Sequence, residues 1–247
     1  MQSRYRWLIF LSCLCLLLNL AADTSNNSTA DENTLVIGML KFDYVLDPRK
    51  GHTSNDMQIL NGLYEGLVSY HPITMETIPA QAYQWEISPD NTVYTFYLRD
   101  NAYYADGTPV TAEDFRQSFL RNLDPKAGSE YAGYLDVIKG AKNYREGKNS
   151  DPLSVAIRAL APKKLEIILE KPANHFLKVL CMIIFSPIHP AYYKLENWEQ
   201  KVPLFTNGPF MLSQRDDKRL LFIKNKYYWD SSQVKLNGVC SLKDRSC

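Results

Sequence analysis

Between residues 88 and 124 the chain carries a series of local signals that agree with one another. Residues 88–91 are Ser, Pro, Asp and Asn, which favour a turn. Residues 92–98 are mostly β-branched or aromatic and therefore favour a strand. The period of two along a strand places three of these side chains on one face: Tyr94, Phe96 and Leu98. A β-hairpin is therefore expected in this region.

A capped helix is expected directly after the hairpin. Residues 106–109 form a second turn sequence, and Thr111 is suited to cap the helix that follows. Asp114, three residues later, resembles the partner of a capping box. The buried stripe of the helix is predicted to be Phe115, Phe119 and Leu123. Asp124 and the proline after it end the helix, because proline disfavours helical geometry in the residue before it.

The remaining predicted elements alternate irregularly along the chain. A buried strand is expected at residues 34–40, a strand at 165–170 and two more between 204 and 228. Further helices are predicted at 57–67, at 131–144 and after Asn174, which can cap its helix. This mixture indicates an α/β or α+β fold with more than one sheet.

Residues 1–22 are predicted to be a secretory signal peptide. Arginines precede an apolar run at 7–20, which is shorter than the roughly 18 residues of a membrane-spanning helix, and two alanines follow it. An uncleaved N-terminal anchor stays open as an alternative. A lipid anchor is disfavoured because Cys13 and Cys15 lie inside the run, whereas a modified cysteine should close it. Residues 23–33 are expected to form a flexible polar leader.

Composition and motifs argue against several functions. The formal net charge of +1 leaves no broad basic face for nucleic acid. The chain has no G-x-S-x-G motif and no glycine-rich phosphate loop, and its 4 His are too dispersed for a recognisable metal site. No catalytic residue, metal or cofactor is therefore predicted. An enzyme whose site is assembled from distant residues stays an alternative.

Several motifs occur in an order that resembles a known family. They lie at residues 63–67, 88–99, 104–115, 124–125, 130–135, 206–210 and 228–230. The chain is similar to the family 5 extracellular solute-binding proteins over residues 34–239. That family serves oligopeptide, dipeptide and nickel importers, and the 130–135 motif is most similar to the oligopeptide branch.

The resemblance implies an α/β fold of the periplasmic-binding-protein type (type II, peptide-binding class). Residues 34–64 and 191–239 would form a discontinuous first lobe, and residues 65–190 an inserted α/β domain. Residues 240–247 depart from the family pattern and are expected to form an atypical tail. Because family members continue for about as long again, the fold is expected to be incomplete, with the second lobe missing.

The resemblance also implies a function: the extracytoplasmic, periplasmic substrate-binding component of an ABC transporter. Its partners would be oligopeptides and an inner-membrane permease. The backbone of residues 51–54, with His52, Thr53 and Ser54, is expected to pair with an extended peptide, opposite Tyr131 across a groove. Truncation is expected to impair binding, and a non-binding remnant or a structural exported protein stays an alternative.

Overall fold

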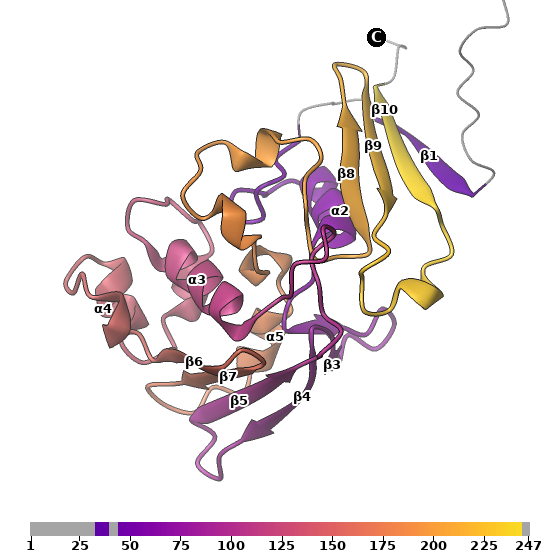
Figure 1. The fold of residues 1–247 in the computed structure, drawn as a ribbon. Helices are drawn as coiled ribbons and strands as arrows, with labels where there is room; N and C mark the ends of the chain where they lie inside the picture. Colours follow the sequence, from indigo (N-terminus) through magenta and orange to yellow (C-terminus); the bar gives the residue numbers. More distant parts are fainter. Residues whose placement is uncertain (1–32, 40–43, 244–247) are drawn as a thin grey trace, which may run out of the picture. The chain divides into compact units, whose positions relative to one another are not determined.

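Two four-stranded sheets organise the part of the chain that the computed structural model describes, residues 33–39 and 44–243. The strands of the first sheet are, in order, β1 (Thr34–Met39), β10 (Gly238–Lys243), β9 (Arg219–Lys224) and β8 (Phe210–Arg215). β1 pairs in parallel with β10, so the two ends of the described chain lie side by side (Figure 1). The predicted signal peptide, the leader before Asn33 and residues 244–247 lie outside the described residues.

Two predictions about this sheet are corrected. β1 is an edge strand and not a buried one, with Leu35 46% and Val36 49% exposed. The expected boundary after Val239 falls inside β10, where Cys240 lies between Val36 of β1 and Leu221 of β9. Residues 240–243 therefore belong to the sheet and not to an atypical tail.

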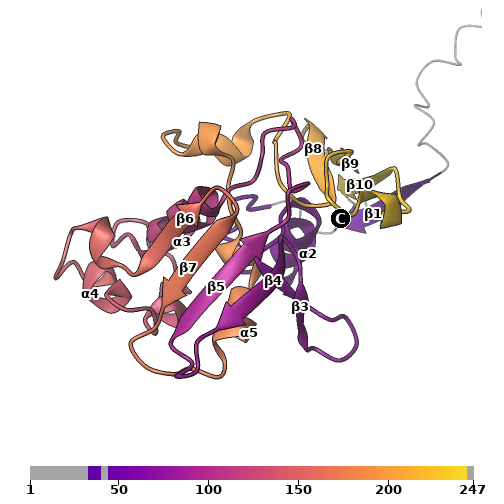
Figure 2. The same ribbon diagram turned by 60° about the horizontal axis from the view of Figure 1, so that its bottom comes forward.

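The second sheet confirms the predicted hairpin. Its strands are, in order, β4 (Ala82–Ile87), β5 (Val93–Leu98), β7 (Lys164–Ile168) and β6 (Ile157–Ala161) (Figure 2). The side chains of Tyr94, Phe96 and Leu98 are buried, as the alternation predicts. The helix α3 (Ala112–Leu123) packs against this sheet, and Thr111 and Asp114 form the predicted capping box at its start. A short hairpin of β2 (Val68–Tyr70) and β3 (Thr77–Pro79) completes the sheet structure of the described residues.

The other helices differ from the predictions at their ends. α2 (Ser54–Leu63) begins three residues earlier than expected and is capped by Thr53. The helix expected at 131–144 is reduced to a 3-10 turn (Ala132–Leu135) and α4 (Ala141–Arg145). α5 (Phe176–Leu180) starts after His175, without a side-chain cap from Asn174. None of the helices in the described ranges is long and apolar enough to cross a bilayer.

The described residues contain two hydrophobic cores. One is drawn from residues 67–185 and lies around the second sheet, with α3 and α5. The other is drawn from residues 44–64 and 188–222 and lies between α2 and the first sheet. Because the described residues from Thr34 onward cluster as one compact unit, the division into a first lobe and an inserted domain at 65–190 stays a prediction.

Candidate functional site

A groove with a volume of about 480 Å³ runs along the start of α2, and it is called the α2 groove below. Its residues come from the loop before α2, from α2 itself, from β2 and from two segments that pack against the core of residues 67–185. They are His52, Thr53, Ser54, Met57, Asn61, Tyr70, Tyr131 and residues 181–184. The structure therefore brings together all four residues that the sequence singled out. Their role in binding stays a prediction.

The buried carboxylate of Asp56 lies behind the α2 groove and holds the loop that contributes His52 and Thr53 to its lining. It accepts hydrogen bonds from the backbone N–H of Val45 (3.0 Å) and of Thr53 (3.0 Å), and from the Thr53 hydroxyl (2.7 Å). Burial raises the pKa of Asp56, but the hydrogen bonds from Thr53, Val45 and His52 outweigh burial and hold this pKa below its ordinary value. The Thr53 hydroxyl also accepts from the Asp56 N–H, so this side chain serves the helix cap.

This arrangement decides which backbone groups the loop can offer to a ligand. The Gly51 N–H donates to the Asp47 carbonyl (3.2 Å), and the N–H groups of His52 and Thr53 donate to Asp56 (3.4 and 3.0 Å). No hydrogen bond among the described residues ends on the carbonyl oxygens of Gly51 and His52. The loop before α2 therefore presents carbonyl acceptors at Gly51 and His52, while the N–H groups of residues 51–53 are already used internally.

Tyr131 supplies aromatic surface on another side of the groove. It directly precedes the 3-10 turn Ala132–Leu135, and its ring stacks on Tyr134 with centroids 6.4 Å apart and an interplanar angle of 16°. Tyr131 is half-buried and packs against the core drawn from residues 67–185. Its position is thus fixed by internal contacts while part of the ring stays accessible.

The residues that complete the groove were not predicted from the sequence. Met57 follows Ser54 by three positions and Asn61 follows Met57 by four, so their common helix face was a usable signal. Tyr70, whose hydroxyl donates to the Lys178 carbonyl at 2.8 Å, carried no such signal. Cys181, which lies among apolar residues in the sequence, is only half-buried and lines the groove.

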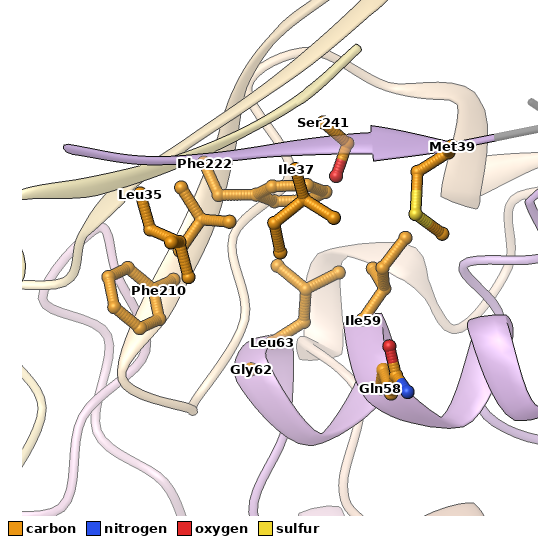
Figure 3. A pocket seen from close by; sticks show the side chains of 11 residues that line it. Leu35, Ile37, Met39, Gln58, Ile59, Gly62, Leu63, Phe210, Phe222 and Ser241 are labelled. Carbon is orange, nitrogen blue, oxygen red and sulfur yellow. The ribbon is translucent and has the colours of Figure 1, made fainter. Parts of the chain in front are cut away.

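A second cavity, of about 220 Å³, lies between α2 and the inner face of the first sheet. Figure 3 shows Leu35 and Ile37 of β1 pointing toward Leu63 of α2. The lining of this second cavity is almost wholly apolar, and its polar side chains are those of Gln58 and Ser241. Because a specific ligand site needs several placed polar groups, the α2 groove is the better candidate.

Motifs that lie far apart in the sequence meet at one junction. The Glu65 carboxylate accepts hydrogen bonds from the Tyr228 hydroxyl (2.5 Å), the Trp229 indole N–H (2.6 Å) and the Gln81 amide (2.6 Å). The guanidinium of Arg99 lies 3.6 Å from the centroid of the Trp229 ring. We call these five side chains the Glu65 junction.

Hydrogen bonds also fix the backbone of Glu65 at this junction. The Asn207 side chain accepts from the Glu65 N–H (3.2 Å) and donates to the Glu65 carbonyl (2.8 Å). A side chain at Gly208 would meet the Leu63 backbone at 2.5 Å, so only glycine allows this approach. The junction joins segments of both hydrophobic cores and therefore serves the scaffold.

The fold and the positions of these motifs define a class of binding protein. Residues 76–242 match the bacterial extracellular solute-binding proteins, family 5, middle region. The chain belongs to the family 5 extracellular solute-binding proteins, and its mixed α/β fold is that of their peptide-binding members.

Individual relatives make the likeness more specific. The periplasmic murein peptide-binding protein MppA of Escherichia coli K12 is 34% identical over 230 residues, which cover 91% of this chain and 42% of MppA. The dipeptide-binding protein DppE of Bacillus subtilis is 35% identical, over 85% of this chain and 39% of DppE. The periplasmic oligopeptide-binding protein OppA of Escherichia coli K12 is 33% identical, over 90% of this chain and 42% of OppA.

Solved structures agree with the sequence relatives. The unliganded open form of MppA gives a TM-score of 0.80 at 34% identity and covers 88% of this chain and 42% of that chain. Listeria monocytogenes OppA bound to peptide gives a TM-score of 0.80 at 28% identity, over 87% of this chain and 43% of that chain. The chain thus spans about 42% of the length of MppA and OppA.

Proposed function

We propose that this protein binds oligopeptides outside the cytoplasm, as part of the substrate-binding component of an ABC importer. The observation that carries the proposal is the α2 groove, where His52, Thr53 and Ser54 line the same cavity as Tyr131. Relatives named for binding murein peptide, dipeptide and oligopeptide support the class of ligand. The site works by binding and not by catalysis, in the periplasm, and an inner-membrane permease receives the peptide.

The geometry favours an extended peptide with little preference for side chains. The free carbonyl oxygens of Gly51 and His52 would accept N–H groups of the peptide backbone, a contact that every peptide can make. Tyr131, Met182 and Ile183 provide apolar and aromatic surface for peptide side chains. Main-chain contacts therefore supply a common part of the affinity, and the side-chain contacts adapt to sequence.

Calorimetric titration of the full chain with mixed tri- to pentapeptides tests this proposal. Tyr131→Ala is expected to weaken binding about tenfold, ~1.4 kcal/mol, because it removes aromatic surface from the groove. His52→Ala and Ser54→Ala should change the affinity little, because residues 51–54 act through their backbone. Mass spectrometry after the titration should recover the peptides intact.

Tyr83→Ala is the matched control, because Tyr83 is 47% exposed on β4 and does not line the groove. Peptide binding that is unchanged by Tyr131→Ala would contradict the assignment of the site. No binding at any attainable peptide concentration would contradict the function, and cleaved peptides would favour an enzyme.

A further inference from the structure

A third cavity, of about 480 Å³, is lined by four basic side chains, and it is called the arginine cavity below. The basic residues are Arg49, Arg116, Arg121 and Lys126. They come from the loop before α2, from α3 and from the segment that follows α3. Asp124 is the acidic residue in the lining. A chain with a formal net charge of only +1 has thus gathered a local excess of positive charge.

Internal contacts hold two of the guanidinium groups in place. Arg49 donates through Nε and one Nη to the buried carboxylate of Asp47, at 3.0 and 2.7 Å. Arg116 donates through Nη1 to Glu113 (2.9 Å) and through Nε to the Ile157 carbonyl (3.2 Å). Because these contacts leave one terminal nitrogen of each arginine without a partner among the described residues, both side chains are fixed and still able to donate.

Arg121 has no carboxylate partner within the described chain. Its Nη2 donates to the Tyr193 carbonyl, and its guanidinium lies 4.7 Å from the centroid of the Tyr193 ring. Its Nε is buried and forms no hydrogen bond in the described part of the structure. Burial lowers the pKa of Arg121 and the nearby charge of Arg49 lowers it further, and the opposing effects of Tyr193, Asp47 and Asp124 do not reverse this shift. Such a buried donor is unfavourable unless an acceptor reaches it.

The carboxylates around the arginine cavity do not pair with all of its positive charges. Asp47 and Glu113 each pair with one arginine, at 2.7 and 2.9 Å. Asp124 accepts from the Lys126 backbone N–H at 2.9 Å, and it makes no ion pair with Arg121 or Lys126. Arg121 and Lys126 are therefore the two cations whose charge stays uncompensated by direct pairing within the described residues.

We propose that the arginine cavity binds a small oxyanion of the phosphate type, at a site separate from the α2 groove. Free N–H groups of Arg49, Arg116 and Arg121, together with the Lys126 ammonium, exceed what the two oxygens of a carboxylate can accept. A tetrahedral phosphate has more acceptor oxygens and a higher charge, and guanidinium groups match its geometry. The volume of about 480 Å³ leaves room for an organic phosphate as well as the free ion.

Calorimetric titration of the full chain with inorganic phosphate at constant ionic strength tests the site. The unmodified protein is expected to bind phosphate saturably, whereas chloride gives no saturable signal. Lys126→Gln should weaken binding several-fold through the loss of one charge-assisted contact. Arg121→Gln should abolish it. Lys171→Gln is the matched control, because Lys171 is exposed and lies outside the cavity.

Lys126 is exposed, so its variant keeps the fold even if Arg121→Gln does not. Phosphate binding that is unchanged in Lys126→Gln would overturn the proposal, as would a response to phosphate that chloride reproduces. Acetate that binds as tightly as phosphate would overturn the choice of a tetrahedral anion. Loss of peptide binding in Tyr131→Ala with phosphate binding intact would support two separate sites.

Discussion

Replacing Glu65 with alanine is expected to destabilise the chain by about 3 kcal/mol. The change removes the one acceptor that the Tyr228 hydroxyl, the Trp229 indole and the Gln81 amide share, at 2.5–2.6 Å. A typical hydrogen bond contributes about 1 kcal/mol net, and three of them are lost together. Water that enters the vacated space limits the loss to about this value.

Glu65→Gln separates the hydrogen bonds from the charge. The Gln oxygen can accept from Trp229 and Gln81, and its amide can donate to the Tyr228 oxygen, so a loss of at most about 1 kcal/mol is expected. Burial raises the pKa of Glu65 even though Tyr228, Trp229 and Gln81 donate to it. The folded chain therefore binds this proton more tightly than the unfolded chain.

The direction of the pH effect follows from that difference. The stability that Glu65 contributes through protonation is fully present below its unfolded pKa of about 4.5 and is lost as the pH rises through its higher folded pKa. Glu65→Gln has no proton to lose in this range. Its stability should therefore lack this part of the pH dependence of the unmodified protein.

Urea unfolding followed by tryptophan fluorescence measures both effects, because Trp229 belongs to the junction. Glu196→Ala, at an exposed glutamate away from the junction, is the control and should lie within about 0.5 kcal/mol of the unmodified protein. A Glu65→Ala variant as stable as the control would contradict the structural role of Glu65, as would a Glu65→Gln variant that loses as much stability as Glu65→Ala.

Three further changes test local features of the scaffold. Thr53→Ala should lower the unfolding free energy by about 1 kcal/mol in urea, because it removes a helix cap, and an unchanged midpoint would contradict this role. Asp56→Asn should lose about 2 kcal/mol near neutral pH. That difference should shrink as urea titrations are taken below the unfolded pKa of 3.8, because Asp56 has a lowered folded pKa. Gly208→Ala should cost about 1–3 kcal/mol through contact with the Leu63 backbone, whereas Gly133→Ala, with open space around it, should be nearly neutral in thermal unfolding.

The local elements were predictable because their interactions join residues close in sequence. The turn at 88–91, the strand Val93–Leu98 and the capping box of Thr111 and Asp114 all depend on neighbours within a few positions. The helix expected at 131–144 failed for a tertiary reason. Ile138 forms a β-bridge with Leu169, and that pairing interrupts the helical pattern between Ala132–Leu135 and Ala141–Arg145.

The candidate site was predictable only in part. His52, Thr53, Ser54 and Tyr131 came from the family resemblance, and the structure places them around one groove. The sequence did not reveal that Asp56 already occupies the backbone N–H groups of His52 and Thr53, because the carboxylate reaches them only once α2 and its loop have folded.

The sequence by itself determined the hairpin, the helix capped by Thr111 and membership of the family, since these depend on local patterns and on the order of motifs. Only the tertiary structure decided that β1 pairs with β10 across some two hundred residues, and that Glu65 meets Tyr228 and Trp229. The physical reason is that a strand edge and a buried carboxylate accept any suitable partner. The packing of the two cores selects which distant partner reaches them.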